Sequence, residues 1–171
     1  YNRDFLVRFT QLDFVATLKQ LFLQDYGHEK LWVYHENLIL SPDYSRLKMT
    51  RLLENATDTI DFYFPYIADD DFTQAMFDAS ARWVEVQGIV EKDTYNEDTE
   101  IIEEFSNNNI DIYPINSGKL HAKALLIDDR YLYIWSINFS RYSFDANIVI
   151  EVIFADKDII TKVQQVFNSD F

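Results

Sequence analysis

Residues 120–138 read LHAKALLIDDRYLYIWSIN, two short apolar runs with polar residues between them and at their outer ends. The residues between the runs, 128–130, predict a turn and therefore a β-hairpin. His121 and Lys123 are two positions apart in the first run, so on a strand they share one face. Ser136 and Asn138 repeat this spacing after the second run. The hairpin would bring an imidazole, an ammonium, a hydroxyl and an amide together.

This set of groups suits a phosphate. Lys123, Ser136 and Asn138 offer hydrogen-bond donors for phosphate oxygens, and His121 offers a nitrogen nucleophile that titrates near neutral pH. Asp128 follows at the polar end of the first strand. The sequence therefore predicts a site for phosphoryl chemistry on this hairpin.

The spacing resembles the HKD motif of the phospholipase D superfamily, written HxKx4Dx6GSxN. His121, Lys123, Asp128, Ser136 and Asn138 fill its polar positions, and the flanking NSG before the histidine and NFSR after Ile137 are similar as well. The resemblance is to the C-terminal half of bacterial two-motif, cardiolipin synthase-like proteins. It implies an α-β-α sandwich in which a mixed sheet has helices on both faces.

The resemblance also implies a mechanism. His121 would attack phosphorus to form a phosphohistidine, or act as the acid–base partner, while a second HKD motif from another half or a second subunit supplies the other histidine. Lys123 and Asn138 would hold non-bridging oxygens, and Ser136 would add a donor. Asp128 belongs to the catalytic motif, where it orients a neighbour or fixes the hairpin. Neither a metal nor a cofactor is required.

Two positions depart from the family pattern. Trp135 replaces the motif glycine, so an indole either narrows the pocket or points away from it. Val149 stands where the family often has a glutamate that supports a histidine, two residues after Asn147. Glu151, two positions further on, is the candidate for that supporting role, and pairing with a basic residue elsewhere is its alternative.

Composition narrows the class of partner. The chain of 171 residues is 48% hydrophobic and carries a net charge of −14, which suits one packed domain and disfavours broad binding to nucleic acid. It has no cysteine and no apolar run long enough to span a membrane. Because it begins at Tyr1 without a signal-peptide pattern, we expect a piece of a longer polypeptide. Cytoplasmic and membrane-associated locations both stay open.

An internal repeat links the two ends of the chain. Residues 2–26 and 147–171 align at an offset of 145, and each copy predicts a strand, an Asp at a helix N-cap and an amphipathic helix. We interpret 1–26 as the remnant of a preceding repeat, 27–43 as a linker and 44–171 as the HKD domain. The identical pairs are Asn2/Asn147, Val7/Val152, Phe9/Phe154, Asp13/Asp158, Gln20/Gln165, Phe22/Phe167 and Asp25/Asp170.

Between the copies, helical and strand patterns alternate, which predicts an α/β fold with a mixed sheet. The expected helices cover 44–56, a segment beginning near Phe72 after three aspartates, and an acidic segment within 91–109; the expected strands cover 59–66, 84–90 and 110–115. The three aspartates favour a helix N-terminus over a metal site.

Three functions follow as hypotheses. The first is a phosphodiesterase or phosphatidyltransferase that acts on a phospholipid. The second is a homodimeric single-motif nuclease, which the acidic charge disfavours. The third is a non-catalytic binding domain, which Trp135 and Val149 favour.

Overall fold

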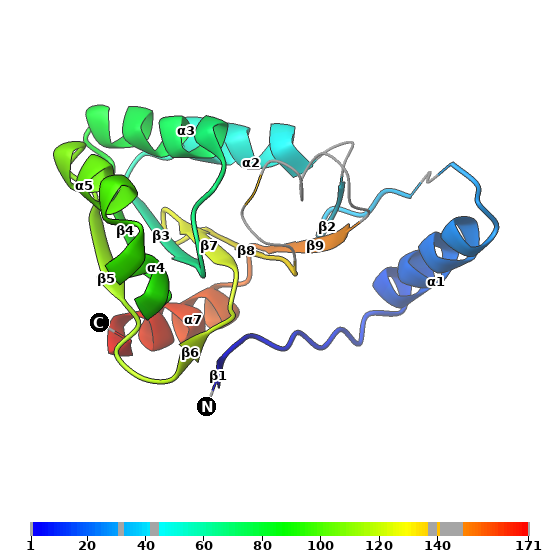
Figure 1. The fold of residues 1–171 in the computed structure, drawn as a ribbon. Coiled ribbons are helices and arrows are strands. Elements are labelled where there is room, and N and C mark those ends of the chain that lie inside the picture. Colours follow the sequence, from blue (N-terminus) through cyan, green and yellow to red (C-terminus); the bar gives the residue numbers. More distant parts are fainter. Residues whose placement is uncertain (1, 31–32, 42–44, 137–139, 141–148, 171) are drawn as a thin grey trace.

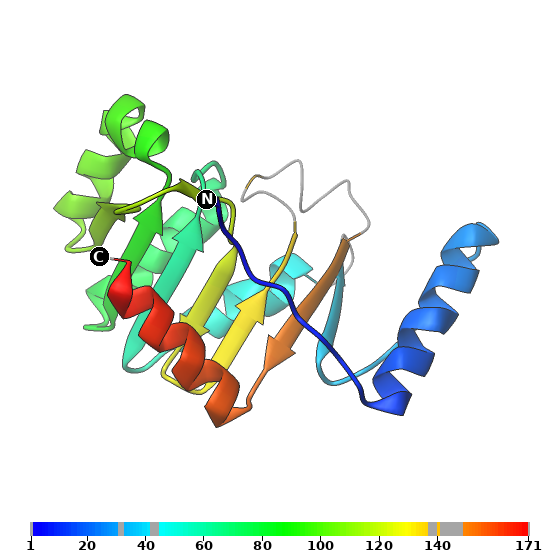
Figure 2. The ribbon, with the colours of Figure 1, turned by 90° about the horizontal axis from the view of Figure 1, so that it is seen from below.

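A computed structural model describes residues 2–30, 33–41, 45–136, 140 and 149–170. Its centre is a seven-stranded mixed sheet in the order β2-β9-β8-β7-β3-β4-β5 (Figures 1 and 2). The strands of this sheet are β2 (Leu38–Ser41), β3 (Thr59–Phe64), β4 (Glu85–Val90), β5 (Asp111–Pro114), β7 (Ala124–Ile127), β8 (Tyr131–Ile134) and β9 (Val149–Phe154).

The sheet has a parallel part and an antiparallel part. β3, β4 and β5 run parallel, because helices connect them, whereas β7, β8, β9 and β2 pair antiparallel. A separate two-stranded sheet pairs β1 (Asn2–Arg3) with β6 (Lys119–Leu120). The predicted α/β class with a mixed sheet is therefore confirmed.

Helices cover both faces of the large sheet. α2 and α3 lie on one face and α7 on the other, while the N-terminal segment crosses the α7 face (Figures 1 and 2). The helices described are α1 (Leu12–Tyr26), α2 (Ser45–Glu54), α3 (Asp70–Ala81), α4 (Lys92–Glu97), α5 (Thr99–Asn107) and α7 (Lys157–Ser169).

Alternation along each strand divides the core into two clusters. On β7, Leu125 packs into the cluster under α2 and α3, whereas Leu126 packs into the cluster under α7. Both clusters are rich in aromatic rings, and Phe62 on β3 leaves no room for a side chain at Gly88 of β4, where a Cβ would come within 2.1 Å of the ring. This two-sided burial makes the strands nearly continuous apolar runs.

Two expected elements differ from the observed ones. The acidic segment forms two helices, α4 and α5, that meet at Asp98. This residue is the C-cap of α4 and the N-cap of α5, and its side chain makes no capping hydrogen bond. In the first repeat copy, the expected strand is limited to Asn2–Arg3, and residues 4–10 are extended without joining the large sheet. In the second copy the same positions form β9, because there a neighbouring strand edge is available on each side.

The helix caps also differ between the copies. Asp156 caps α7 by accepting from the N–H groups of Asp158 and Ile159, whereas the equivalent Gln11 begins α1 without a side-chain cap. An aspartate at the N-cap is therefore confirmed for the second copy, whereas in the first copy Asp13 lies in the first turn of α1 instead. Residues 38–41, within the predicted connection, pair with β9 as the edge strand β2.

Candidate functional site

The HKD residues lie at two opposite ends of the hairpin formed by β7 and β8. His121 and Lys123 directly precede β7, and Ser136 follows β8 as an exposed residue, so these three lie at the same end. Asp128 lies in the turn at the opposite end. Asn138 falls outside the described residues.

Asp128 fixes the hairpin to the start of β3. Its carboxylate accepts hydrogen bonds from the backbone N–H groups of Thr57, Asp58 and Thr59, the one from Asp58 at 2.7 Å. Burial alone would raise the pKa of Asp128, yet these donors together lower it. Its φ of 54° is a left-handed conformation that Asp tolerates better than most residues. Asp128 therefore lies at the end of the hairpin away from His121, where its contacts are those of a hairpin-fixing residue.

Replacing Asp128 should therefore reduce stability and leave the chemistry at His121 in place. We expect Asp128→Ala to lower the free energy of unfolding by about 2–3 kcal/mol, because three backbone N–H groups lose a charged acceptor. Asp128→Asn should cost less, since Asn keeps an acceptor and tolerates positive φ. Because the folded-state pKa is lowered, the advantage of Asp128 over Asn exists above about pH 4 and disappears as the pH falls through that pKa. Urea unfolding of the parent, Asp128→Ala and Asp128→Asn at pH 7 and pH 3 measures the order of stability and its pH dependence. Equal stability of these three proteins at pH 7 would contradict the hairpin-fixing role.

At the other end of the hairpin, His121 meets a carboxylate that the motif does not contain. Its Nδ1 lies 2.9 Å from Oδ2 of Asp4, and its side chain is 65% exposed. A carboxylate at Nδ1 holds a neutral imidazole in the Nδ1–H tautomer, which leaves the Nε2 lone pair free to act as a nucleophile. The pair thus has the geometry of a nucleophile and its orienting group.

Lys123 lies beside this pair but is buried, with 3% of its surface exposed. Its ammonium donates to the backbone carbonyl of His121 at 2.7 Å. Burial lowers the pKa of Lys123, and the charge of Asp4 opposes that shift. A bound phosphate would add negative charge that stabilises this buried ammonium.

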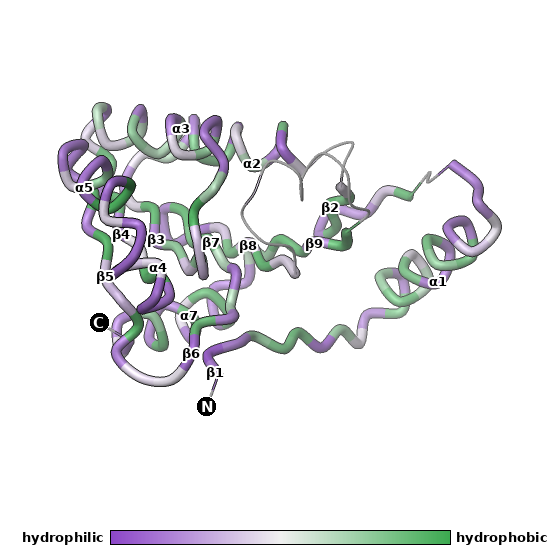
Figure 3. Tube along the Cα trace, in the orientation of Figure 1, coloured by the Kyte–Doolittle hydropathy of each residue, from purple (hydrophilic) through white to green (hydrophobic). Residues whose placement is uncertain are grey.

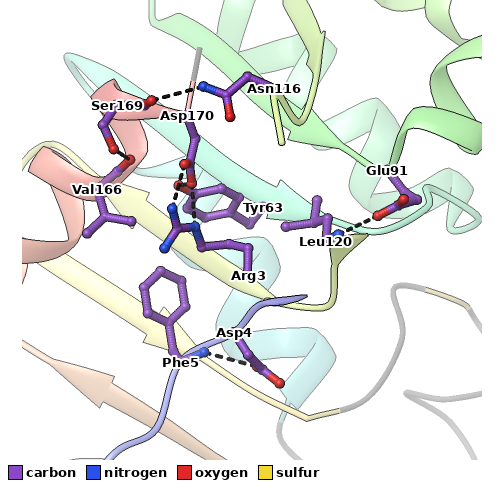
Figure 4. Close-up of polar contacts among 10 residues, drawn as sticks. All are labelled: Arg3, Asp4, Phe5, Tyr63, Glu91, Asn116, Leu120, Val166, Ser169 and Asp170. Atoms are coloured by element: carbon purple, nitrogen blue, oxygen red, sulfur yellow. Dashed lines mark hydrogen bonds and ion pairs between the residues drawn. The ribbon is translucent and has the colours of Figure 1, made fainter. Parts of the chain in front are cut away.

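The segment that carries Asp4 is held firmly against the domain. Arg3 forms a two-point ion pair with Asp170, at 2.6 and 2.7 Å, and the hydroxyl of Tyr63 donates to the same carboxylate (Figure 4). The carbonyl of Arg3 also accepts from the N–H groups of His121 and Ala122, each at 2.9 Å. Arg3, which precedes Asp4 in the chain, is therefore hydrogen-bonded directly to His121 and to Ala122.

The opposite edge of the same short sheet is fixed as well. Glu91 accepts from the N–H of Leu120, and the side-chain amide of Asn116 donates to the carbonyl of Ser169 (Figure 4). Glu91 is the N-cap residue of α4, directly after β4, and Ser169 is the last residue of α7. The position of the imidazole is thus set by the fold on both flanks.

Trp135 occupies the place of the motif glycine and packs into the core cluster under α2 and α3. When the ladder of β7 and β8 is continued by one pair, Trp135 lies opposite Lys123. The backbone N–H of Trp135 donates to the backbone carbonyl of Lys123 at 3.3 Å. The indole is buried against Phe64 and Tyr133, with ring centroids 5.6 and 5.1 Å away. It is therefore a core residue on the α2 and α3 face, next to the lysine.

The hydrogen-bond partners of Glu151 are hydroxyl groups and not the expected histidine. Glu151 is fully buried on β9 and accepts from the hydroxyls of Tyr133 and Ser41, the latter bonded in turn to Ser45. Burial raises the pKa of Glu151, although these hydroxyl donors oppose the shift. The expected supporting role is thus not seen at Glu151, and the carboxylate that meets His121 belongs to Asp4.

The sequence held one signal for Asp4 that the motif analysis did not use. At the repeat offset of 145, Asn2 aligns with Asn147 and Asp4 aligns with Val149. The asparagine-x-acid pattern that is missing after Asn147 is therefore present in the first copy. Asn147 itself lies outside the described residues.

No part of this arrangement indicates a metal centre. The described residues contain no cluster of three or more acidic or histidine side chains suited to an ion. Asp69 of the acidic triplet caps α3 by accepting from the N–H of Phe72, and Arg46 pairs with Asp69 and Asp71. A membrane-crossing helix is likewise not found among the helices that the structure describes.

A mixed seven-stranded sheet with helices on both faces, carrying this hairpin, defines a domain of phospholipase D type. A family model described as "Cardiolipin synthase, PLD-like domain" matches residues 49–171. The chain belongs to this family of phospholipase D-like domains, which confirms the predicted family.

Known relatives agree with the family. Cardiolipin synthase 1 of Staphylococcus epidermidis is 27% identical over 131 residues, which cover 71% of this chain and 26% of the relative. The chain thus spans about a quarter of the length of the curated relatives it matches.

Solved structures show the same fold. NucT from Helicobacter pylori has a TM-score of 0.70 at 17% identity, over 78% of this chain and 92% of NucT. Nuc from Salmonella typhimurium, a phospholipase D family member, has a TM-score of 0.68 at 15% identity, with the same coverage. Phosphatidylserine synthase from Haemophilus influenzae has a TM-score of 0.64 at 12% identity, over 77% of this chain and 37% of its own.

Proposed function

We propose that this domain is one half of a phospholipase D-type phosphodiesterase or phosphatidyltransferase that acts on a phospholipid through a phosphohistidine. The observation that carries the proposal is the contact of His121 with Asp4 beside the ammonium of Lys123, on residues with HKD spacing. The second HKD motif comes from another half or subunit. The similarity to a cardiolipin synthase supports the phospholipid as substrate.

The reaction has two displacements at phosphorus. Nε2 of His121 attacks, a P–N bond forms, the P–O bond to the leaving alcohol breaks, and the histidine of the second motif gives that oxygen a proton. Water or an acceptor alcohol then gives its proton to the same histidine and attacks phosphorus, which breaks the P–N bond and restores His121. Water as acceptor makes a hydrolase, and an alcohol makes a transferase.

Donors at this end of the hairpin stabilise the charge that develops in each step. In this proposal the donors are Lys123, Ser136 and Asn138, which fill motif positions of the sequence. A fixed donor that faces a developing charge where water is excluded contributes about 3–4 kcal/mol to a transition state. The buried ammonium of Lys123 meets this condition best, since its surroundings exclude most water.

A comparison of substrates tests the proposed function. The full gene-encoded polypeptide is assayed with vesicles of a zwitterionic phospholipid, with a water-soluble phosphodiester and with single-stranded and double-stranded DNA. We expect turnover of the lipid and the small diester and no turnover of DNA, because a chain of net charge −14 repels a polyanion. Cleavage of DNA alone would favour the nuclease, and no turnover of any diester would favour the binding domain.

Asp4 is expected to act as a positioning residue for His121. Asp4→Asn should lower kcat roughly 10–100-fold with little change in KM, the usual cost of losing a group that orients a reacting one. The amide can donate to Nδ1, so the imidazole should shift toward the Nε2–H tautomer, which ¹⁵N NMR of the ring nitrogens detects. Asp4→Glu should recover part of kcat. Unchanged kcat and an unchanged tautomer in Asp4→Asn would contradict this role.

A further inference from the structure

A cavity lies beneath the N-terminal segment that carries Asp4. Residues 4–9 of this segment cross the α7 face of the large sheet (Figure 2). A space of about 380 Å³ remains between them, the ends of β8 and β9, and α7. Pockets that bind small molecules enclose about 300–1,000 Å³. The cavity is therefore large enough for a ligand, and the chemistry at His121 does not account for it.

The walls of the cavity are mainly apolar. Residues 5–9 read FLVRF, a largely hydrophobic stretch of the chain (Figure 3). Its inner residues Phe5, Val7 and Phe9 are half-buried against the cluster under α7. The opposite wall is formed by the apolar side chains of Ile134, Phe154, Ile159 and Val163. Because methylene groups gain free energy when they leave water for such surroundings, these walls suit a hydrocarbon chain.

The segment over the cavity is held at its two ends. At one end Arg3 pairs with Asp170, and at the other the ring of Phe9 stacks on Phe154, with centroids 5.5 Å apart. Residues 4–8, between these contacts, form no ladder with the large sheet. The segment can therefore keep its place while a ligand fills the space beneath it.

One end of the cavity adjoins the proposed catalytic site. Phe5 directly follows Asp4, whose carboxylate contacts His121. On the side of the sheet, Ile134 pairs with the residue that follows Lys123. The ammonium and the imidazole thus lie near this end, and apolar side chains extend away from it. A phosphate at the catalytic site, with a hydrocarbon chain beneath the segment, matches this order of charged and apolar groups.

The other end of the cavity is polar. Around Phe9 and Phe154, the lining residues are Arg8, Gln11, Asn37 and Asp156. These side chains mark where the apolar wall ends. A hydrocarbon chain should therefore gain affinity with length only until it reaches them.

We propose that the cavity is a subsite for one acyl chain of the phospholipid, on the part of the substrate that stays with phosphorus when the head group leaves. The inference rests on the proposed function for the phosphate that anchors the chain at His121. It gives residues 5–9, which lie outside the HKD motif, a role in substrate binding. Because the cavity is at the small end of the size range for ligand sites, we assign one chain to it and not two.

The subsite predicts that affinity depends on chain length. Calorimetry of the full gene-encoded polypeptide with methyl, butyl, hexyl and octyl phosphate measures this dependence, at concentrations at which each probe is monomeric. Burial of one methylene strengthens binding about threefold to fourfold. We expect Kd to fall by that factor for each added methylene until the apolar wall ends.

Ile159→Trp fills the cavity from α7, and Val166→Trp is its matched control. Both positions hold half-buried apolar residues of α7, and Val166 lies outside the cavity lining. We expect Ile159→Trp to lose most of the chain-length dependence while Kd for methyl phosphate stays unchanged, and Val166→Trp to match the parent. Val7→Trp fills the same space from the opposite wall, so the test stands even if Ile159→Trp does not fold.

A Kd that is independent of chain length in the parent would overturn the proposal. An undiminished dependence in the folded cavity-filling variants would also overturn it, because the chain would then bind elsewhere. Turnover of the para-nitrophenyl diesters of the same alkyl groups is measured in parallel. Chain-length-dependent binding without turnover would refute the proposed reaction and support the subsite, whereas turnover without any effect of chain length would do the reverse.

Discussion

His121→Asn is expected to abolish turnover, with a fall in kcat of roughly 10⁴-fold or more, the scale seen when a covalent nucleophile is removed. The imidazole is largely exposed and contacts Asp4 by one hydrogen bond, so stability should be nearly unchanged. Asn can still bond to Asp4 but cannot attack phosphorus. Loss of activity without loss of fold is therefore the expected signature.

His28→Asn is the matched control for this variant. His28 is also exposed, and its φ of 54° is one that Asn adopts readily. We expect this variant to keep full activity, with the same melting temperature as the parent. If His121→Asn retained more than about a tenth of the parent kcat, where a nucleophile normally accounts for several powers of ten, His121 would be neither nucleophile nor essential acid.

Lys123→Met is expected to separate stability from activity. Removal of a fixed charge that faces the phosphate should lower kcat about 10²–10³-fold. Stability should stay equal or rise, because an apolar side chain of similar length avoids the cost of burying an ammonium between core strands. A melting curve and a kcat measurement on the same protein check both halves of this prediction.

Lys123→Arg is the control that keeps the charge. The guanidinium is larger and planar, so it should not reach the carbonyl of His121 from a buried position, and activity should stay low. In the parent, burial lowers the pKa of Lys123, so its charged form and the activity that needs it should be lost at a lower pH than for an exposed lysine. A Lys123→Met variant that is less stable yet fully active would contradict both parts of the argument.

Local patterns predicted most of the architecture. The two apolar runs at 120–138 predicted the hairpin, because turn residues and strand alternation act over a few positions. The three aspartates predicted the start of α3, where Asp69 is the observed cap. The alternation of strands and helices predicted a mixed sheet between helical layers, which the seven strands confirm.

The parts that sequence reasoning missed depend on contacts between distant residues. Asp4 is 117 positions from His121, and they meet because Asn2–Arg3 pairs with Lys119–Leu120. The segment 4–9 has the alternation of a strand but crosses the α7 face of the sheet without joining a ladder (Figure 2). Trp135 replaces a glycine, and its burial beside Phe64 follows from the β3–β7 register. Periodicity describes an element and does not state its partner.

The central claim is that Nε2 of His121 forms a covalent bond to phosphorus. The direct measurement is rapid quenching of the gene-encoded polypeptide during turnover of a phosphodiester, at alkaline pH to preserve the P–N bond, followed by mass spectrometry of the peptide that contains residues 120–130. We predict a phosphoryl or phosphatidyl group on His121 that is absent in His121→Asn and diminished in Asp4→Asn. Sustained turnover with that peptide unmodified and the group on another histidine would contradict the assignment of His121 as nucleophile.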